Sequence, residues 1–172
     1  MSIDPASDPR GTAPRGAKGA RDSGGEASGR ARPRMIRLLI ADDHPAVRVA
    51  LVELFEAIDD IHVVGACADG IEVTPTAELT EPDVVLMDLQ MPRMSGLEAT
   101  RELLAAQPHV RVVVLSGHVT PAWAQEAMVA GAAGFLLKEE DPGDLPERIR
   151  IVAAGGTAWS EAAAELCASG QA

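Results

Sequence analysis

Short apolar runs rich in Val, Ile and Leu recur along the chain from Met35 onward. Runs that are apolar at nearly every position are typical of parallel strands buried on both faces of a sheet. The expected strands are Ile36–Ala41, Ile61–Cys67, Val84–Met87, Val110–Leu115 and Gly134–Leu137. Segments with helical spacing of apolar residues lie between and after them. This alternation predicts an α/β fold, a doubly wound five-stranded parallel sheet with helices on both faces.

The length of 172 residues and an apolar content of 47% predict a single globular domain, which we expect over residues 35–156. Residues 1–34 are rich in Gly and Pro and almost free of large apolar side chains, so we expect a disordered N-terminal extension. Met35 directly precedes the first expected strand, so the natural start is Met1 or Met35. Residues 157–172 are expected to be a C-terminal tail or the remnant of a linker.

Charge and composition disfavour some functions. Residues 35–172 carry a net charge of −14, whereas nucleic-acid binding requires Lys and Arg to neutralise phosphates. Four aromatic residues in the whole chain leave little for base stacking. The two cysteines, Cys67 and Cys167, lack the spacing of a zinc site or a disulfide framework. We find no membrane-spanning or signal segment in the sequence, so we expect a cytoplasmic protein without membrane or nucleic-acid contacts.

Polar residues stand where several expected strands end. Asp42 and Asp43 follow the first strand, Asp88 follows the third, Ser116 the fourth and Lys138 the fifth. Each has an ordinary explanation alone, such as a helix cap, a turn or a solvated side chain. The carboxyl ends of parallel strands meet at one edge of the sheet, where doubly wound folds bind their ligands. We therefore expect these five side chains to converge.

Three carboxylates in one crevice require a cation, and oxygen ligands favour Mg²⁺. No Cys or His is expected in the cluster, which disfavours zinc. A lysine and a serine hydroxyl beside this cation would suit an incoming phosphoryl group, with one carboxylate as the nucleophile.

Four motifs together resemble the receiver domain of bacterial two-component response regulators. They are ADDHP at 41–45, VVLMDLQMPRMSG at 84–96, LSG at 115–117 and AGAAGFLLK at 130–138. The similarity extends from about Ile36 to Ser160 and is strongest to the subgroup that usually carries a LuxR-type (NarL/FixJ-like) helix-turn-helix output domain. It implies a flavodoxin-like strand order of 2-1-3-4-5.

The resemblance also implies roles for individual residues. Asp88 would accept a phosphoryl group from a histidine kinase, Ser116 and Lys138 would bind phosphoryl oxygens, and Phe135 would be a switch residue together with Ser116. The Mg²⁺ ligands would be Asp43, Asp88 and the backbone carbonyl of Gln90, with Asp42 acting through a metal-bound water. Gly96 is expected to adopt backbone angles closed to other residues.

The sequence leaves two alternatives for how such a protein passes on its signal. Only sixteen residues follow Gly156, too few for a helix-turn-helix domain. We expect a phosphoacceptor rather than an enzyme, acting through a homodimer or a downstream protein partner. The alternative is a LuxR-type transcriptional regulator truncated before its DNA-binding domain. An aspartyl-phosphate hydrolase is disfavoured because Gln90 stands where a second aspartate would be needed. Nucleotide binding is disfavoured because the chain lacks a glycine-rich phosphate loop.

Overall fold

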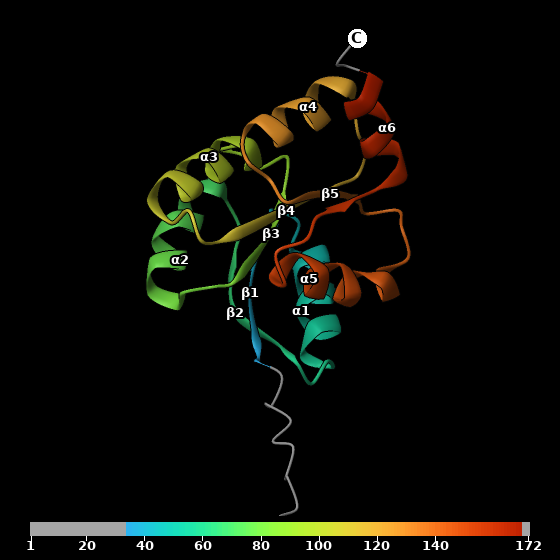
Figure 1. Ribbon diagram of the computed structural model, residues 1–172. Helices are drawn as coiled ribbons and strands as arrows, with labels where there is room; N and C mark the ends of the chain where they lie inside the picture. Colours follow the sequence, from blue (N-terminus) through green and yellow to red (C-terminus); the bar gives the residue numbers. More distant parts are fainter. Residues whose placement is uncertain (1–33, 170–172) are drawn as a thin grey trace, which may run out of the picture. The chain divides into compact units, whose positions relative to one another are not determined.

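The computed structural model describes residues 34–169. They form one parallel sheet with the strand order β2-β1-β3-β4-β5-β6 (Figure 1). The strands are β1 (Ile36–Ala41), β2 (Ile61–Cys67), β3 (Val84–Asp88), β4 (Arg111–Ser116), β5 (Gly134–Leu137) and β6 (Ala158–Trp159). The expected order 2-1-3-4-5 and the doubly wound α/β class are confirmed, with a short sixth strand added at the β5 edge.

Helices connect the strands. They are α1 (Pro45–Glu56), α2 (Val73–Thr80), α3 (Gly96–Ala106), α4 (Pro121–Val129), α5 (Leu145–Ala153) and α6 (Glu161–Ser169), with 3-10 turns η1 (Gly70–Glu72) and η2 (Pro142–Asp144). Successive residues of a strand point to opposite faces, so β4 sends Val113 and Leu115 into the core beneath α1 and α5. Val112 and Val114 face the other side, toward α3 and α4 respectively. Both faces of the central strands are therefore buried.

The C-terminal part of the described chain adds a strand and a helix to the fold. β6 pairs in parallel with β5, and Ser160 begins α6 by accepting a hydrogen bond from the Ala163 amide at 3.1 Å. α6 packs on α4, with Ala163 buried in the same cluster as Phe135. A Cβ at Gly134 would lie 2.1 Å from the Ala158 carbonyl oxygen, so only glycine allows this pairing. Much of the expected tail over 157–172 is therefore a strand and a helix.

The expected disordered extension, residues 1–34, lies outside the described residues except for Arg34, which pairs with Asp83 at 2.8 Å. In the described part of the chain, none of the helices is long and apolar enough to cross a membrane.

Candidate functional site

The expected site residues gather at the carboxyl edge of the sheet. Asp88 is the last residue of β3, the central strand between β1 and β4, and its backbone pairs with Leu115. Asp42 follows β1 and Lys138 follows β5, and the Lys138 amide donates to the Ser116 carbonyl at 2.8 Å. The parallel register thus brings together residues that lie up to 96 positions apart.

Lys138 joins two buried carboxylates. Its Nζ lies 2.7 Å from Asp42 Oδ2 and 2.8 Å from Asp88 Oδ1. Asp42 is 1% exposed and Asp88 4% exposed, so both charges depend on this ammonium. The other oxygen of Asp88, Oδ2, is buried and has no hydrogen-bond partner among the described residues. A buried carboxylate oxygen without a partner is costly, which indicates a place for a ligand.

Burial and the ion pair have opposite effects on the pKa values of Asp88 and Lys138. Burial raises the pKa of Asp88 despite the opposing effect of Lys138, and the charges of Asp42 and Asp43 add to the rise. Burial acts to lower the pKa of Lys138, but its contacts with Asp42 and Asp88 outweigh this effect and raise it. Lys138 therefore stays charged at neutral pH, while the charged form of Asp88 is disfavoured by burial, and a bound cation would favour it.

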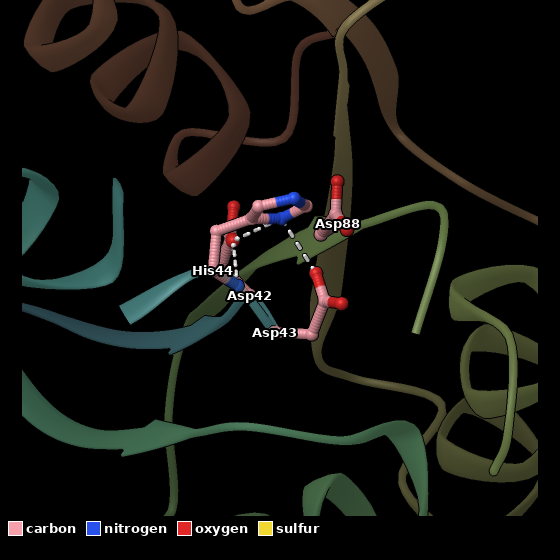
Figure 2. Close-up of side chains that lie close together, drawn as sticks. All are labelled: Asp42, Asp43, His44 and Asp88. Carbon is pink, nitrogen blue, oxygen red and sulfur yellow. Dashed lines mark hydrogen bonds and ion pairs between the residues drawn. The ribbon is translucent and has the colours of Figure 1, made fainter. Parts of the chain in front are cut away.

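A group of potential metal ligands surrounds this place (Figure 2). The group is Asp42, Asp43, His44 and Asp88, whose ligand atoms lie within 4.8 Å of one another. The carboxylates and the unpartnered Asp88 Oδ2 fit a hard divalent cation such as Mg²⁺. The expectation that no histidine accompanies the cluster is wrong, because the chain turns into α1 directly after Asp43 and brings His44 back over the carboxylates.

Asp42 and Asp43 do not cap α1 with their side chains. His44 occupies the N-cap position, and Pro45 follows at the first helical residue. Asp42 Oδ1 instead accepts from the His44 backbone amide at 2.9 Å, which fixes the turn between β1 and α1.

The loop after Asp88 is held at both ends. The Gly96 amide donates to the Leu89 carbonyl at 2.9 Å, and Ser95 and Glu98 form a capping box that begins α3. A Cβ at Gly96 would lie 2.0 Å from the Asp88 carbonyl oxygen. Gly96 is not among the described residues with positive φ, so close packing against Asp88, rather than unusual backbone angles, requires glycine there.

Asp69 ties this loop to a neighbouring one, which the sequence analysis did not foresee. Its Oδ2 accepts from the Arg93 backbone amide at 3.0 Å and from Arg93 Nε at 3.2 Å, while Oδ1 accepts from the Ile71 amide. Gly70 packs so closely that a Cβ would lie 2.4 Å from the Met94 carbonyl oxygen. These contacts position the middle of the segment that carries the Gln90 carbonyl.

A cavity of about 240 Å³ opens at the site, lined by His44, Val47, Asp88, Gln90, Ser116, Gly117, His118 and Lys138. Ser116 is buried, and its Oγ accepts weakly from the His118 amide at 3.5 Å. A Cβ at Gly117 would meet nothing within 4 Å, which leaves room for an incoming group. The His118 ring stacks obliquely on Trp123, with ring centroids 4.6 Å apart.

Phe135 is not among the residues that line this cavity. It is fully buried on β5, where its backbone pairs with Val114, and it packs in a cluster with Leu89, Ala127 and Ala163.

A second, larger cavity of about 460 Å³ adjoins the first. It is an apolar groove between α1 and the end of β5, lined mainly by Ala46, Val47, Ala50, Leu54, Leu137 and Leu145. Val47 and Lys138 line both cavities, so the groove leads directly to the phosphoacceptor candidate.

The fold and the strand-end site define the class: a doubly wound domain with a buried carboxylate beside a lysine and a cluster of potential cation ligands. Residues 38–150 match the family model of the response regulator receiver domain. The chain belongs to this family.

Particular relatives refine the comparison. The chain is 41% identical over 120 residues to an uncharacterized transcriptional regulatory protein, YxjL, of Bacillus subtilis (strain 168), covering 70% of this chain and 55% of the relative. It is 40% identical over 121 residues to the response regulator GacA of Pseudomonas viridiflava, covering 70% of this chain and 56% of GacA. The chain thus spans about half the length of these curated relatives.

Solved structures of response regulators are also similar to this chain. A LuxR-family two-component response regulator from Aurantimonas sp. SI85-9A1 superposes with a TM-score of 0.74 at 35% identity, covering 78% of this chain and 96% of that structure. The receiver domain of the putative response regulator NarL from Mycobacterium tuberculosis gives a TM-score of 0.68 at 32% identity, covering 72% and 99%.

Proposed function

We propose that this protein accepts a phosphoryl group on Asp88 from a histidine kinase, in a Mg²⁺-dependent phosphorelay of a two-component system. The observation that carries the proposal is the buried Asp88 carboxylate, which lines a cavity with Ser116 and Lys138 and has one oxygen without a hydrogen bond from residues 34–169. As a receiver domain, the protein would be a phosphoacceptor rather than a free-standing enzyme, and its place would be the cytoplasm.

The transfer follows from the positions of the protein groups. An Asp88 carboxylate oxygen attacks the phosphorus of a phosphohistidine, the P–N bond breaks, and an acyl phosphate forms while the kinase imidazole leaves. Lys138 Nζ can pass from Asp88 Oδ1 to a phosphoryl oxygen because Asp42 keeps holding it at 2.7 Å. The Ser116 hydroxyl would donate to another phosphoryl oxygen. Positioning and charge neutralisation supply most of the rate in such reactions.

Asp43, Asp88 and the Gln90 carbonyl would hold the Mg²⁺, with Asp42 acting through a metal-bound water. The cation supplies neutralisation of the negative charge that builds up between the phosphoryl group and the carboxylates. The Asp69 and Arg93 contacts would keep the Gln90 segment in place for this role.

The kinase would dock along the apolar groove beside α1. This assignment is supported by the continuity of the groove with the phosphoacceptor cavity through Val47 and Lys138. Signalling would then proceed by protein contacts, through a homodimer or a downstream partner. The alternative is a truncated LuxR-type transcriptional regulator that has lost its DNA-binding domain, and the greater length of the relatives supports this alternative.

Phosphorylation can be tested with a small phosphodonor such as acetyl phosphate. We expect a phosphate-dependent gel shift of the wild-type protein with Mg²⁺, and none in EDTA or in Asp88→Asn, because the variant lacks the nucleophile. Asp59→Asn is the matched control, since Asp59 is an exposed aspartate in the turn before β2, and it should be labelled like wild type. Equal labelling of Asp88→Asn and wild type would refute the assignment.

A further inference from the structure

His44 is the member of the metal-ligand group to which the proposed phosphotransfer assigns no role. Its Nδ1 lies 2.7 Å from Asp43 Oδ1 and 3.6 Å from Asp42 Oδ1 (Figure 2). The backbone contact from its amide to Asp42 fixes the residue at the start of α1. The imidazole therefore lies close to the carboxylates, and its side chain is 65% exposed.

The other contacts in the group limit which atoms are available to a cation. Asp42 is already bound to Lys138 and to the His44 amide. Asp88 Oδ2 is buried and accepts no hydrogen bond within the described part of the chain, which independently points to a ligand at this place. Asp43, Asp88 and His44 are therefore the side chains best placed to bind a cation directly.

A nitrogen in this set changes which cations the site prefers. Carboxylate and carbonyl oxygens suit Mg²⁺, whereas imidazole nitrogen binds first-row transition ions far better than it binds Mg²⁺. A histidine whose proton is on Nε2 carries a lone pair on Nδ1 and can use it as a metal ligand. We propose that His44 is a nitrogen ligand of the receiver cation and makes this site selective for a divalent transition ion such as Mn²⁺ over Mg²⁺.

This inference rests on the proposed function, because both concern the same cation site. It differs from a second possibility, that His44 only orients Asp43 through its N–H. An orienting group would support every cation alike, whereas a nitrogen ligand supports Mn²⁺ more than Mg²⁺. The ratio of the two dissociation constants separates the two roles.

The test is titration calorimetry of the full chain with Mn²⁺ and with Mg²⁺, in wild type, His44→Asn and His62→Asn. Asn is a good N-cap residue and keeps an N–H donor, so α1 should remain intact. We expect the preference for Mn²⁺ to fall about tenfold in His44→Asn, an effect of the size typical for groups that tune a metal site, with Mg²⁺ binding changed less than about twofold. His62 is an exposed histidine on β2, and its variant should behave like wild type.

Pulsed electron paramagnetic resonance of bound Mn²⁺ gives a direct readout of its ligands. The measurement on the wild-type protein does not depend on whether a variant folds. We expect ¹⁴N coupling from a ligated imidazole in wild type and in His62→Asn, and its loss in His44→Asn. Absence of this coupling in wild type, or an equal change of both affinities in His44→Asn, would overturn the proposal. If Mg²⁺ still supports labelling of Asp88 in that case, the proposed function stands and only the role of His44 fails. If neither cation binds, both fail.

Discussion

Asp88 carries a buried carboxylate whose position suits the proposed role as phosphoacceptor better than it suits stability. Burial raises its pKa, and among the described residues Lys138 is the cation that pairs with it. Functional sites often contain such unfavourable groups, because the arrangement that binds the ligand is fixed in advance. The neighbouring Ser116 is also buried, and its hydroxyl accepts a long hydrogen bond of 3.5 Å from the His118 amide, so a closer partner could replace this contact.

Ser116 should couple phosphorylation to the rest of the domain. A phosphoryl oxygen can bond this hydroxyl and draw the loop after β4 inward, and a ligand shifts an equilibrium only through such differential contacts. We therefore expect Ser116→Ala to be labelled at Asp88 but to lose most of the phosphodonor-induced change in hydrogen exchange over residues 117–138. Because Phe135 packs with Ala163, the change in wild type should extend into α6.

A second probe is Phe135→Leu, which keeps the buried site apolar while removing the ring. It should also reduce the change in α6. If Ser116→Ala shows the full wild-type change in protection, the coupling is wrong and Phe135 acts as an ordinary core residue.

At the scale of elements, strands were easier to predict than the connections between them. The expected bounds of β1, β2 and β5 agree with the structure because continuous apolar runs specify buried strands directly. β6 was missed because a two-residue strand has no periodicity to detect. The signal for α6 was available, since Ser160 stands as an N-cap before an Ala-rich run.

The features of the candidate site also differ in how well the sequence predicts them. Convergence of Asp88, Ser116 and Lys138 follows from parallel strand order alone. The Asp69–Arg93 contacts join two loops whose residues are 24 positions apart, and no local pattern indicates such a pairing. The sequence places His44 directly after the two aspartates. The position of its ring depends on the turn into α1, which the sequence does not specify.

The link between these two loops yields a prediction for Asp69→Asn. Hydrogen bonds from Ile71 and Arg93 outweigh the effect of burial and hold the pKa of Asp69 below its ordinary value. A lowered pKa stabilises the fold above the ordinary carboxyl range and loses that effect as the pH falls through the folded value. The variant should therefore be less stable than wild type at pH 7, and the difference should shrink toward pH 3. Urea unfolding at both values measures it.

The same variant should bind Mg²⁺ more weakly, by up to about tenfold, since groups behind the ligands commonly affect metal affinity this strongly. Glu72→Gln is the matched control. Glu72 contacts Arg93 only at the exposed outer nitrogen of the guanidinium, Nη2, at 3.1 Å. Removing the Glu72 charge should therefore leave Mg²⁺ binding close to wild type. Unchanged Mg²⁺ affinity in Asp69→Asn would show that the loop holds its position without this contact.

The whole molecule is strongly acidic, and this property bears on its output. With a net charge of −14 over residues 35–172, we expect no sequence-specific binding to duplex DNA at moderate salt, with or without phosphorylation. Any weak retention should be salt-sensitive and should disappear when residues 1–34, with their net positive charge, are deleted. Gel-shift and footprinting assays test this directly. A protected footprint from this chain alone would contradict the prediction and favour the transcriptional alternative.

The two edges of the sheet have a consequence for the behaviour of the protein at high concentration. An open edge strand is a template for another chain and a common route to aggregation. Here β6 covers part of the β5 edge, and the β2 edge carries an irregularity, since Leu38 pairs with Val63 but Leu39 pairs with Gly65. Such a bulge twists an edge strand away from flat pairing. Assembly of this protein should therefore proceed through helical faces, and fibril-like growth along the sheet should be suppressed even in crowded solution.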